Sequence, residues 1–333
     1  MTIAVIGAGS WGTALAQILA KNGSQVFLWA RRESVARSID SSHRNPDYLS
    51  SVELSTSIRA SSDLEEVVRG AEAVVLVTPS KVMRSMACEL SRLVGSSVPV
   101  VVCFKGVEEN TGCLPLEVLE QEMGNAGRFA VLSGPNHAEE VAVGIPAGTV
   151  VASACAETAD AFQQLFSVPQ FRVYTSSDAV GVELCAAAKN VIAIAVGLSY
   201  GVGYGDNTAS MLITRGMAEM SRLVSKAAGD PLTCMGLAGA GDLIATCMSR
   251  HSRNRRFGEA FARGTTLDRF HEETHMVVEG ALACKNLSVL EQRYGIELPI
   301  TDVVRGLIWE GLTIDEARDA LNARSLKPEF YGI

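Results

Sequence analysis

Short apolar segments alternate with amphipathic segments through the first half of the chain. The apolar runs are rich in β-branched residues and lie at residues 3–6, 25–29, 73–78, 98–104, 129–132, 148–152 and 171–174. Strands that are apolar throughout are buried on both faces, and helices cover both faces when such strands are parallel. We therefore predict a doubly wound parallel sheet over residues 1–180.

The pattern changes near residue 180. Alanine, leucine, isoleucine and methionine recur from there with helical spacing, and the expected helices lie at about residues 179–200, 208–228, 231–237, 239–248, 253–263, 278–294, 300–311 and 313–323. The longest apolar region is interrupted by Lys189 and Asn190, so we expect no membrane-spanning run of ~18 residues. The sequence thus predicts an α/β domain over residues 1–180 and an all-helical domain over residues 181–333.

A glycine-rich turn follows the first predicted strand. Gly7, Gly9 and Gly12 are spaced as in a G-x-G-x-x-G motif, and a helix-compatible segment follows them. In such a motif the first glycine forms the tight turn, the second lets the backbone approach a pyrophosphate, and the third allows the helix to pack closely on the strand. The N–H groups at the start of the helix then face the phosphates. This pattern predicts a Rossmann-like, dinucleotide-binding first domain.

Arginines end the second predicted strand, where sites that prefer NAD carry an acidic residue for the ribose 2′-hydroxyl. The sequence there reads Trp29-Ala30-Arg31-Arg32. Two guanidinium groups are suited to a 2′-phosphate and favour NADP, although Glu33 is a late acidic candidate and Arg32 could equally be a solvated charge. The expected cofactor is NADP or NAD.

Polar residues follow two later strands. Lys105 comes after the run at residues 98–104, and Gly134, Pro135 and Asn136 come after the run at 129–132. Ligands of open α/β sheets bind outside the carboxyl ends of the strands. Lys105 could contact a substrate oxygen or phosphate, Gly134 would allow close backbone approach, and Asn136 offers a donor and an acceptor.

Lys189 lies in a helix that is apolar on nearly every face. Desolvation lowers the pKa of a buried lysine toward the range that is useful for general acid and base catalysis. A lysine that extends from the helix face to water is the alternative. We favour catalysis, because no wider polar face surrounds Lys189.

Two polar segments follow in the second domain. Asp242 could orient the Lys189 ammonium, although an aspartate after glycine is often only a helix cap. Ser252 can cap the next helix, and Arg253 and Asn254 place donors near its N-terminus, a suitable position for a phosphate. A nucleic-acid patch would look similar over a few residues, but this one lacks interleaved aromatic residues.

Charge and cysteine usage narrow the partners. The formal net charge is −8, which disfavours nucleic acid or an anionic membrane as the main partner. Eight cysteines are scattered without a C-x-x-C pair, so we expect reduced thiols and no metal site. The chain opens on a strand pattern without the features of a signal peptide, which favours a cytoplasmic location. The expected partner is a small phosphorylated substrate, without membrane insertion, and the sequence is compatible with a homodimer.

These segments together resemble the bacterial NAD(P)-dependent glycerol-3-phosphate dehydrogenases over nearly the whole chain. The segments that carry the resemblance are residues 7–10, 105–106, 133–135, 188–193, 213–216, 239–243 and 252–256 with Gly258. Phe104 and Asn136 depart from the family's commonest pattern, which has Thr at the first position and often Ser or Thr at the second.

The resemblance implies a role for each matching residue. Lys189 would be the proton donor and acceptor. The implied substrate contacts are Lys105, Gly134, Asn136, Asp242, Ser252, Arg253 and Asn254. The implied nucleotide contacts are Ser10, Trp11, Arg31, Lys105, Ala138, Arg253, Val277 and Glu279, in addition to Gly7, Gly9, Gly12 and Arg32 from the motif reasoning.

The function implied is reversible reduction of dihydroxyacetone phosphate to sn-glycerol 3-phosphate by NAD(P)H, which would supply glycerophospholipid synthesis. One alternative is a β-hydroxyacid dehydrogenase, whose family pattern has an Asn one turn after the lysine, where this chain has Ala193. The other is a sensor that binds NAD(P) without turnover. The presence together of Lys189, Asp242 and Arg253 argues against a sensor.

Overall fold

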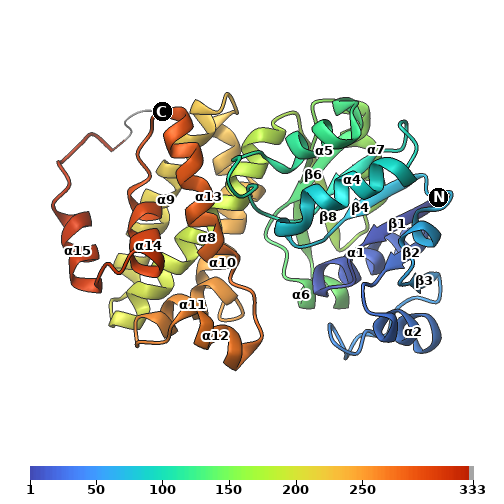
Figure 1. Cartoon of the computed structure of the whole chain (residues 1–333), viewed down its shortest axis with the longest axis horizontal. Coiled ribbons are helices and arrows are strands. Elements are labelled where there is room, and N and C mark those ends of the chain that lie inside the picture. The colour runs from blue at the N-terminus through green and yellow to red at the C-terminus, as the bar shows by residue number, and fades with distance from the viewer. Residues whose placement is uncertain (330–333) are drawn as a thin grey trace. The chain divides into compact units, whose positions relative to one another are not determined.

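The computed structural model of the chain describes residues 1–329 and divides into two compact units (Figure 1). The first unit contains Met1–Lys105 and Pro115–Ala179, and the second contains Gly106–Leu114 and Val180–Ile333. The sequence analysis placed residues 106–114 in the first domain, whereas the structure groups them with the second unit. The chain therefore passes from one unit to the other three times.

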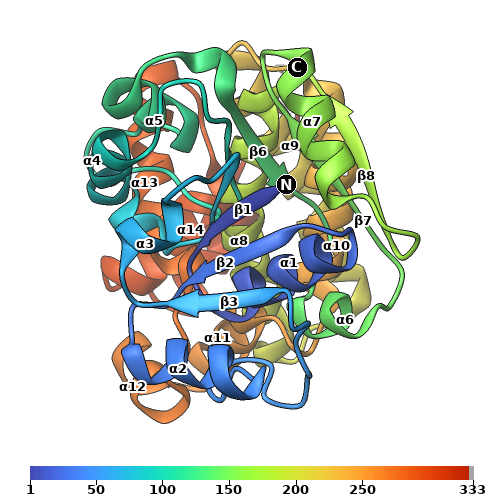
Figure 2. The same cartoon turned by 90° about the vertical axis from the view of Figure 1, so that its right-hand side faces the viewer.

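An eight-stranded sheet forms the centre of the first unit. Its strands are β1 (Thr2–Ile6), β2 (Gln25–Trp29), β3 (Ile58–Ser61), β4 (Ala73–Leu76), β5 (Val100–Val102), β6 (Phe129–Ser133), β7 (Ala147–Ala152) and β8 (Phe171–Ser176). Their order is β3-β2-β1-β4-β5-β6-β7-β8, and Figure 2 shows β3, β2 and β1 side by side. All neighbours are parallel except β6 and β7. The doubly wound sheet is confirmed, but the prediction of an entirely parallel sheet is wrong at this pair.

The register of the sheet brings strand ends together. Ile6 at the end of β1 pairs with Trp29 on β2 and with Leu76 on β4. The segments that follow these three strands therefore leave the sheet on the same side, at the carboxyl ends of the strands. Open α/β sheets bind their ligands outside these carboxyl ends.

Helices connect the strands of the first unit. They are α1 (Ser10–Lys21), α2 (Glu33–Ser42), α3 (Leu64–Val68), α4 (Met83–Leu93), α5 (Pro115–Met123), α6 (Ala138–Val143) and α7 (Ala156–Phe166), with single 3₁₀ turns η1 (Ser80–Val82) and η2 (Ala126–Arg128). Helix α1 buries nearly all of its residues from Gly12 to Leu19. It packs against α6 and α7, so the helix after the glycine motif belongs to the core of the unit.

Every secondary-structure element of the second unit within the described residues is a helix or helical turn, as predicted, whereas its segment of residues 106–114 is a loop. Its elements are α8 (Ala179–Val202), α9 (Asp206–Lys226), the 3₁₀ turn η3 (Pro231–Met235), the π-helical turn η4 (Leu237–Gly241), α10 (Asp242–Met248), α11 (Arg253–Phe261), α12 (Leu267–Thr274), α13 (Glu279–Tyr294), α14 (Pro299–Trp309) and α15 (Ile314–Asn322). Strand β3 and helix α12 have no counterpart among the elements expected from the sequence.

Helix α8 is the core of the second unit, and all its residues from Gly181 to Ser199 are buried. Other helices approach its backbone at glycines. A Cβ atom at Gly197 would lie 2.1 Å from the backbone oxygen of Arg255, and one at Gly258 would lie 2.3 Å from the backbone oxygen of Ile194. Helices α8 and α11 therefore meet backbone to backbone, which requires glycine on both sides.

The same helix corrects one sequence expectation. Within the described residues, α8 is the one helix whose length and composition alone would allow it to cross a membrane. The interruption by Lys189 and Asn190 does not prevent this. However, 89% of its most apolar stretch is buried inside the protein, and core helices of globular proteins also meet the criteria of length and composition.

Candidate active site

The glycine turn between β1 and α1 has the geometry that its motif requires. Gly7 has a φ of +125°, and a Cβ atom at Gly12 would lie 1.8 Å from the backbone oxygen of Gly7. A Cβ at Gly9, in contrast, would meet no atom within 4 Å. The open side of the turn is therefore at Gly9, where a ligand can approach the backbone.

The start of α1 is suited to an anion. Helix α1 begins with Ser10, Trp11 and Gly12. No side chain caps its N-terminus, and its first turn contains no acidic residue. The N–H groups of a first turn have no partner within the helix, and the helix dipole favours negative charge there. An anionic ligand such as a pyrophosphate would complete this helix end.

Asn45 holds the glycine turn in place, a role that the sequence analysis missed. Its Nδ2 atom donates hydrogen bonds to the backbone oxygen of Ala8 at 2.9 Å and to Oγ1 of Thr13 at 2.9 Å. Asn45 is fully buried. It lies 32 residues after Thr13 along the chain, so no local pattern could have revealed the contact.

The two arginines after β2 differ in their surroundings. Arg32 forms an ion pair with Asp47. Arg31 is exposed, and its guanidinium has no hydrogen bond or ion pair within residues 1–329. Arg31 is therefore the one of the two that is available to a ligand without breaking an existing contact.

Buried polar atoms without partners lie at or just after the ends of strands β4 and β6, which flank β5 in the sheet. Oγ1 of Thr78, Oγ of Ser133 and Oδ1 of Asn136 are buried and have no hydrogen-bond partner in the described chain. Buried polar groups are rarely left unpaired, so these atoms are candidates for ligand contacts. Asn136 was predicted from the sequence, whereas Thr78 and Ser133 were not.

Three further sequence candidates, Gly134, Lys105 and Ala138, lie near the ends of β5 and β6 along the chain. Nδ2 of Asn136 donates to the backbone oxygen of Gly148 at 3.0 Å, which fixes the amide. A Cβ at Gly134 would lie 2.8 Å from Cα of Thr149, so the glycine is required by packing against β7. Its predicted close approach to a ligand has no direct support in this geometry. Half-buried Lys105 follows β5, and Ala138 is the first residue of α6.

Lys189 lies in the buried middle of α8 and contacts two polar side chains. Its Nζ atom donates to Oδ1 of Asp242 and to Oγ1 of Thr246, the latter at 2.7 Å. Lys189 is 5% exposed and Asp242 is 2% exposed. Burying an unpaired ammonium would cost several kcal/mol, so these partners make the buried position possible. The alternative of a lysine extending to water is wrong.

Helix α10 supplies both partners of Lys189. Asp242 and Thr246 are four residues apart and therefore share one face of the helix. Oγ1 of Thr246 also donates to the backbone oxygen of Asp242 at 2.6 Å. The sequence analysis identified Asp242 but missed Thr246, whose spacing of four residues was the available signal.

The N-terminus of α11 is capped as predicted. Oγ of Ser252 accepts a hydrogen bond from the backbone N–H of Arg255 at 3.3 Å. Arg253 is exposed, and its guanidinium has no hydrogen bond or ion pair among the described residues. Arg253 and the helix N-terminus can therefore meet an anion together.

Asn254 connects three helices within the second unit. Its Nδ2 atom donates to Oδ1 of Asn190 at 2.9 Å, and its Oδ1 atom accepts from the N–H of Gly280 at 3.0 Å. These contacts join α11 to α8 and to the start of α13. Val277, which is exposed, and Glu279 flank this start. Much of the Asn254 amide is thus used for structure, although the sequence analysis assigned it to substrate.

The predicted site residues are therefore divided between the two units. Those of the first unit are Gly7, Gly9, Ser10, Trp11, Gly12, Arg31, Arg32, Lys105, Gly134, Asn136 and Ala138. Those of the second unit are Lys189, Asp242, Ser252, Arg253, Asn254, Val277 and Glu279. The first group offers anion and polar contacts at strand ends. The second offers a buried ammonium and an exposed guanidinium at a helix start.

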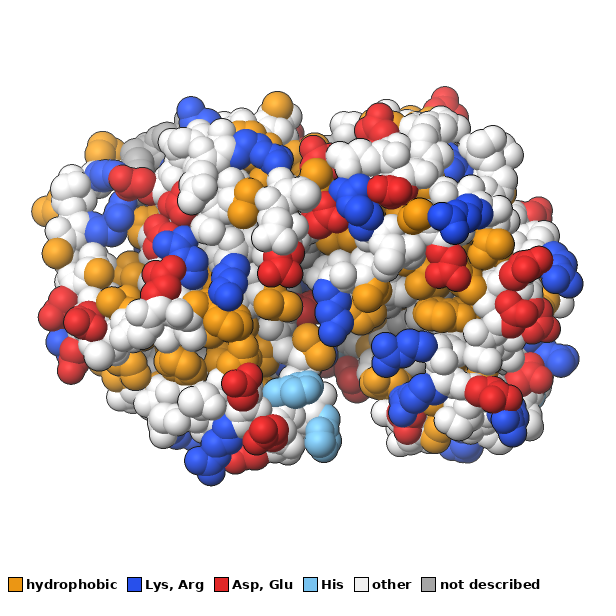
Figure 3. Space-filling view, in the orientation of Figure 1, with side chains coloured by type: hydrophobic (Ala, Val, Ile, Leu, Met, Phe, Trp, Pro, Cys, Tyr) orange, Lys and Arg blue, Asp and Glu red, His pale blue; other side chains and the backbone are white. Residues whose placement is uncertain are grey.

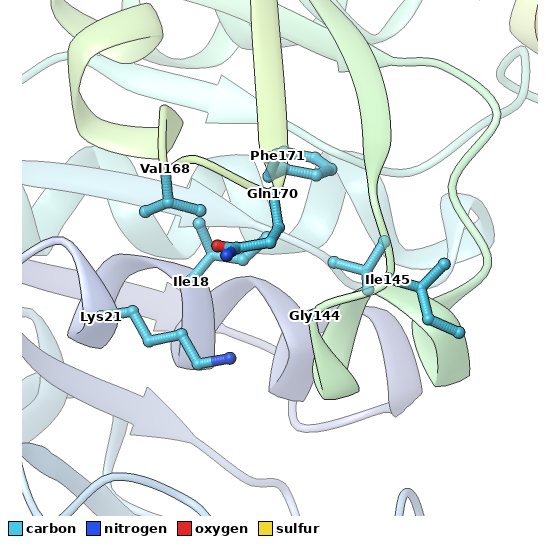
Figure 4. Close-up of a pocket in the computed structure, with 8 residues that line it drawn as sticks. Ile18, Lys21, Gly144, Ile145, Val168, Gln170 and Phe171 are labelled. Atoms are coloured by element: carbon cyan, nitrogen blue, oxygen red, sulfur yellow. The ribbon is translucent and has the colours of Figure 1, made fainter.

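A small pocket in the first unit contains none of these residues. It is lined by side chains of α1, α6 and the start of β8, among them Ile18, Lys21 and Phe171 (Figure 4). Its cavity volume is about 10 Å³, which is the space of about one water molecule. It is too small for a nucleotide. Within residues 1–329 no group of three or more His, Cys, Asp or Glu side chains could hold a metal ion.

Comparison with known proteins identifies the family of both halves. The N-terminal sequence profile of NAD-dependent glycerol-3-phosphate dehydrogenase matches residues 2–159, and the C-terminal profile matches residues 178–319. The chain is 44% identical to a glycerol-3-phosphate dehydrogenase [NAD(P)+] of Chlorobium luteolum over 99% of both chains. It is 43% identical to that of Bacillus pumilus over 97% of this chain and 94% of the relative.

A solved structure agrees with this result. The crystal structure of glycerol-3-phosphate dehydrogenase from Coxiella burnetii has a TM-score of 0.92 and 35% identity, over 97% of this chain and 99% of the other. The two family profiles together extend over the glycine turn, Lys189 and the start of α11. The chain belongs to the NAD-dependent glycerol-3-phosphate dehydrogenase family.

Proposed function

We propose that this chain is an oxidoreductase that transfers a hydride reversibly between NAD(P)H and dihydroxyacetone phosphate, giving sn-glycerol 3-phosphate. Membership of the family supports this reaction over a β-hydroxyacid dehydrogenase or a non-catalytic sensor. The observation that carries the proposal is the buried Lys189 ammonium, held by Asp242 and Thr246. A sensor would not need a charged group at this cost in desolvation.

The residues of the first unit fit a dinucleotide. The open turn at Gly9 and the uncapped start of α1 suit a pyrophosphate, and the unpartnered atoms of Thr78 and Ser133 offer polar contacts. When bound, the nicotinamide supplies the hydride chemistry. Arg31 would contact the 2′-phosphate of NADP, and the shared contacts would serve NAD as well.

Lys189 is the proposed general acid. As the ketone is reduced, negative charge grows on its oxygen, and the ammonium stabilises that charge and donates a proton. In the oxidative direction the amine takes the proton back. Asp242 and Thr246 hold Nζ in place, so that the proton moves from a fixed atom.

Arg253 and the start of α11 are the proposed phosphate contacts, together with Ser252, Asn254 and Lys105. The forked guanidinium matches two phosphate oxygens at once. Asn254 would act mainly by fixing the start of α11 against Asn190 and Gly280. Anchoring the phosphate would orient the ketone carbon for the hydride.

The two domains would divide these tasks. The first unit would bind the dinucleotide and contribute Lys105, and the second unit would supply Lys189 and the remaining phosphate contacts. We further propose a cytoplasmic enzyme that supplies glycerophospholipid synthesis, acts without nucleic acid or membrane insertion, and is compatible with a homodimer. Lys, Arg, Asp and Glu side chains are interspersed on the face in Figure 3, which does not resemble an extended basic surface for nucleic acid.

Parallel assays with three substrates test the reaction. The absorbance of NADH and NADPH would be followed with dihydroxyacetone phosphate, with unphosphorylated dihydroxyacetone, and with a β-ketoacid. We expect oxidation of the nucleotide only with the phosphorylated ketone at low substrate concentration. Turnover of the β-ketoacid alone would favour the hydroxyacid alternative, and nucleotide binding without any turnover would favour a sensor.

A further inference from the structure

Two buried cysteines of the second unit lie in contact, outside the proposed catalytic residues. Cys185 is in α8, Cys234 is in η3, and their Sγ atoms are 3.5 Å apart. Both side chains are buried, with 0% and 2% of their surface exposed. Cys284, another buried thiol of this unit, donates instead to the backbone oxygen of Ala281 at 3.1 Å.

Only a small movement separates this pair from a covalent bond. A disulfide has an S–S distance of about 2.05 Å, so the two sulfur atoms must approach by about 1.5 Å. Helix α8 is held in the core, but η3 is a single turn of five residues and is followed by Gly236. The structure therefore allows η3 to make the movement.

The same turn gives a small oxidant access to Cys234. The residues on both sides of it in η3 reach solvent, since Leu232 is 74% exposed and Met235 is 69% exposed. Cys234 is thus covered by one surface turn rather than by a deep layer of protein. Local opening of such a turn costs much less free energy than global unfolding.

Both cysteines are coupled to the residues around Lys189. Cys185 precedes Lys189 by four residues and lies on the same face of α8. On the other side, a Cβ at Gly239 would lie 2.3 Å from the backbone oxygen of Cys234, so the η4 backbone rests directly on Cys234. Asp242 follows Gly239 by three residues, and a shift of Cys234 would therefore be transmitted to Asp242.

We propose that Cys185 and Cys234 are a redox modification site, at which a small peroxide forms a disulfide that lowers the dehydrogenase activity by displacing Asp242 from Lys189. The loss of activity rests on the proposed function, whereas the disulfide does not. The pair would give the enzyme a reversible response to peroxide.

The chemistry balances with hydrogen peroxide as oxidant. The Cys234 sulfur attacks one peroxide oxygen, the O–O bond breaks, and water and a sulfenic acid result. The Cys185 sulfur then attacks the sulfenic sulfur, the S–S bond forms, the S–O bond breaks, and a second water leaves. The two thiols lose two electrons and two protons, and the peroxide is reduced to two water molecules. A dithiol reductant reverses the change.

Peroxide treatment of the full chain tests the site. The reduced protein would be exposed to hydrogen peroxide, its remaining thiols would be alkylated under denaturing conditions, and its peptides would be mapped by mass. We expect a peptide cross-linked through Cys185 and Cys234, lighter by two hydrogens than its reduced parts. Activity should fall about ten- to a hundred-fold, since a displacement of about 1 Å at an active site can cost ~10²-fold, and dithiothreitol should restore it.

Two variants serve as a matched pair. Cys234→Ala should lose both the cross-link and the sensitivity to peroxide. Cys284→Ala removes an equally buried thiol of the same unit, one that donates only to the backbone oxygen of Ala281 at 3.1 Å, and it should behave like the parent. The mass of the cross-linked peptide from the parent protein shows whether the disulfide forms, even if a variant folds poorly.

Three results would overturn the proposal. One is the absence of the cross-link after treatment that oxidises the half-buried Cys88, Cys113 and Cys155. Another is a complete cross-link with unchanged activity. A third is loss of activity in Cys234→Ala at the same peroxide dose as in the parent. An inactive reduced protein would instead count against the proposed function, and the peptide masses would still decide whether the disulfide forms.

Discussion

At the scale of single residues, Lys189 shows how one charge determines its surroundings. An ammonium in an apolar helix needs a counter-charge, and Asp242 provides it together with the hydroxyl of Thr246. Each partner is then required by the other, because removing one leaves the other charged and buried. Such removal typically costs ~3–5 kcal/mol of stability.

We therefore predict two separate effects of Lys189→Met. The kcat should fall at least ~10²-fold, the lower range for a lost general acid. The free energy of unfolding should also fall by ~3–5 kcal/mol, since the buried carboxylate of Asp242 loses its ammonium partner. Denaturant unfolding and steady-state kinetics would measure the two.

The double variant Lys189→Met with Asp242→Asn is the control for this prediction. It removes both charges, and it should recover most of the stability without recovering activity. A well-folded Lys189→Met protein with kcat within a few-fold of the parent would remove Lys189 from the mechanism.

The cofactor preference is also decided by single residues. Arg31→Asp should lower the ratio of kcat/KM for NADPH to that for NADH by about ten-fold or more, because a charge-assisted hydrogen bond contributes ~1.5–3 kcal/mol. Arg32→Ala is the matched change, and it should move the ratio less because Arg32 is already paired with Asp47. An equal loss with both cofactors would assign Arg31 to a shared contact.

Local patterns predicted part of the site, and chain separation explains the rest. The glycine turn, Lys189 and the start of α11 are contained in short segments, so their spacing is visible in the sequence. Asn45 bonds to atoms that folding brings to it from elsewhere in the chain, and Thr78 has a buried hydroxyl without a partner that only the folded structure reveals. A single asparagine or threonine in a polar stretch carries no local signal of such a contact.

At the scale of elements, α11 joins a capped N-terminus to an exposed guanidinium. Arg253→Ala should lower kcat/KM for dihydroxyacetone phosphate about ten- to a hundred-fold, as expected for loss of a charged hydrogen bond worth ~1.5–3 kcal/mol. The value for the unphosphorylated ketone should hardly change. The measurement is the ratio of the two.

Arg256→Ala provides the comparison on the same helix. Arg256 is exposed, and its guanidinium donates to Sδ of Met276 at 3.6 Å, so its loss should leave the ratio unaltered. If both variants alter the ratio equally, general positive charge selects the phosphate and no particular residue does.

A buried carboxylate from α9 accepts hydrogen bonds at the N-terminus of α14. Glu219 on α9 accepts a hydrogen bond from the backbone N–H of Ile300 at 2.6 Å and one from Thr301 at 3.4 Å. Burial raises the pKa of Glu219 from 4.5 to about 7, with Asp302 adding to the rise, while the hydrogen bonds and the charge of Arg222 oppose it. The carboxyl group therefore titrates near neutral pH in the folded protein.

This raised pKa predicts how stability depends on pH. Between pH 4.5 and about 7 the folded chain keeps the Glu219 proton and the unfolded chain has lost it. Raising the pH through this range therefore lowers the free energy of unfolding, by about 3 kcal/mol once both states are ionised. Below pH 4.5 Glu219 is protonated in both the folded and the unfolded chain, so it no longer makes the free energy of unfolding depend on pH.

Glu219→Gln isolates this group from the other titrating residues. Its amide carbonyl still accepts from Ile300 but carries no charge. The variant should gain stability relative to the parent between pH 5 and pH 8, measured by urea unfolding at each pH. A constant difference across this range would mean that Glu219 stays ionised in the folded protein.

The elements that the sequence failed to predict share a physical cause. Strand β3 has the sequence IRAS and is half exposed at the sheet edge, and α12 buries only Phe270. Neither has the apolar periodicity that identified the other elements. The reversed direction of β7 was equally hidden, because a strand buried on both faces has the same composition in a parallel or an antiparallel pair.

At the scale of the whole molecule, the second unit depends on a segment from the first half of the chain. Val107 and Leu114 of Gly106–Leu114 are buried in its core. Nδ2 of Asn286 donates to the backbone oxygen of Val107 at 2.7 Å, and Arg293 donates to the backbone oxygens of Thr111 and Gly112. The composition changes near residue 180 but not at residue 106. It therefore indicates only one of the three points at which the chain passes from one unit to the other.

A fragment of residues 180–333 should therefore be unstable by itself. It lacks two buried side chains, each worth ~1.5–3 kcal/mol, and leaves Asn286 and Arg293 without these acceptors. Fusing residues 106–114 to its start through a flexible linker should raise the urea midpoint. Equal midpoints for the two fragments would show that the segment contributes nothing to this unit.

The three crossings also set an order of events during synthesis. Residues 106–114 leave the ribosome long before α13, which holds them through Asn286 and Arg293. At ~5–20 residues per second the interval is on the order of ten seconds. During that time Val107 and Leu114 have no core to enter, while the strands on either side of them can already pair. The nascent first unit must therefore fold while the side chains of Val107 and Leu114 remain exposed to solvent, separated by the polar residues between them.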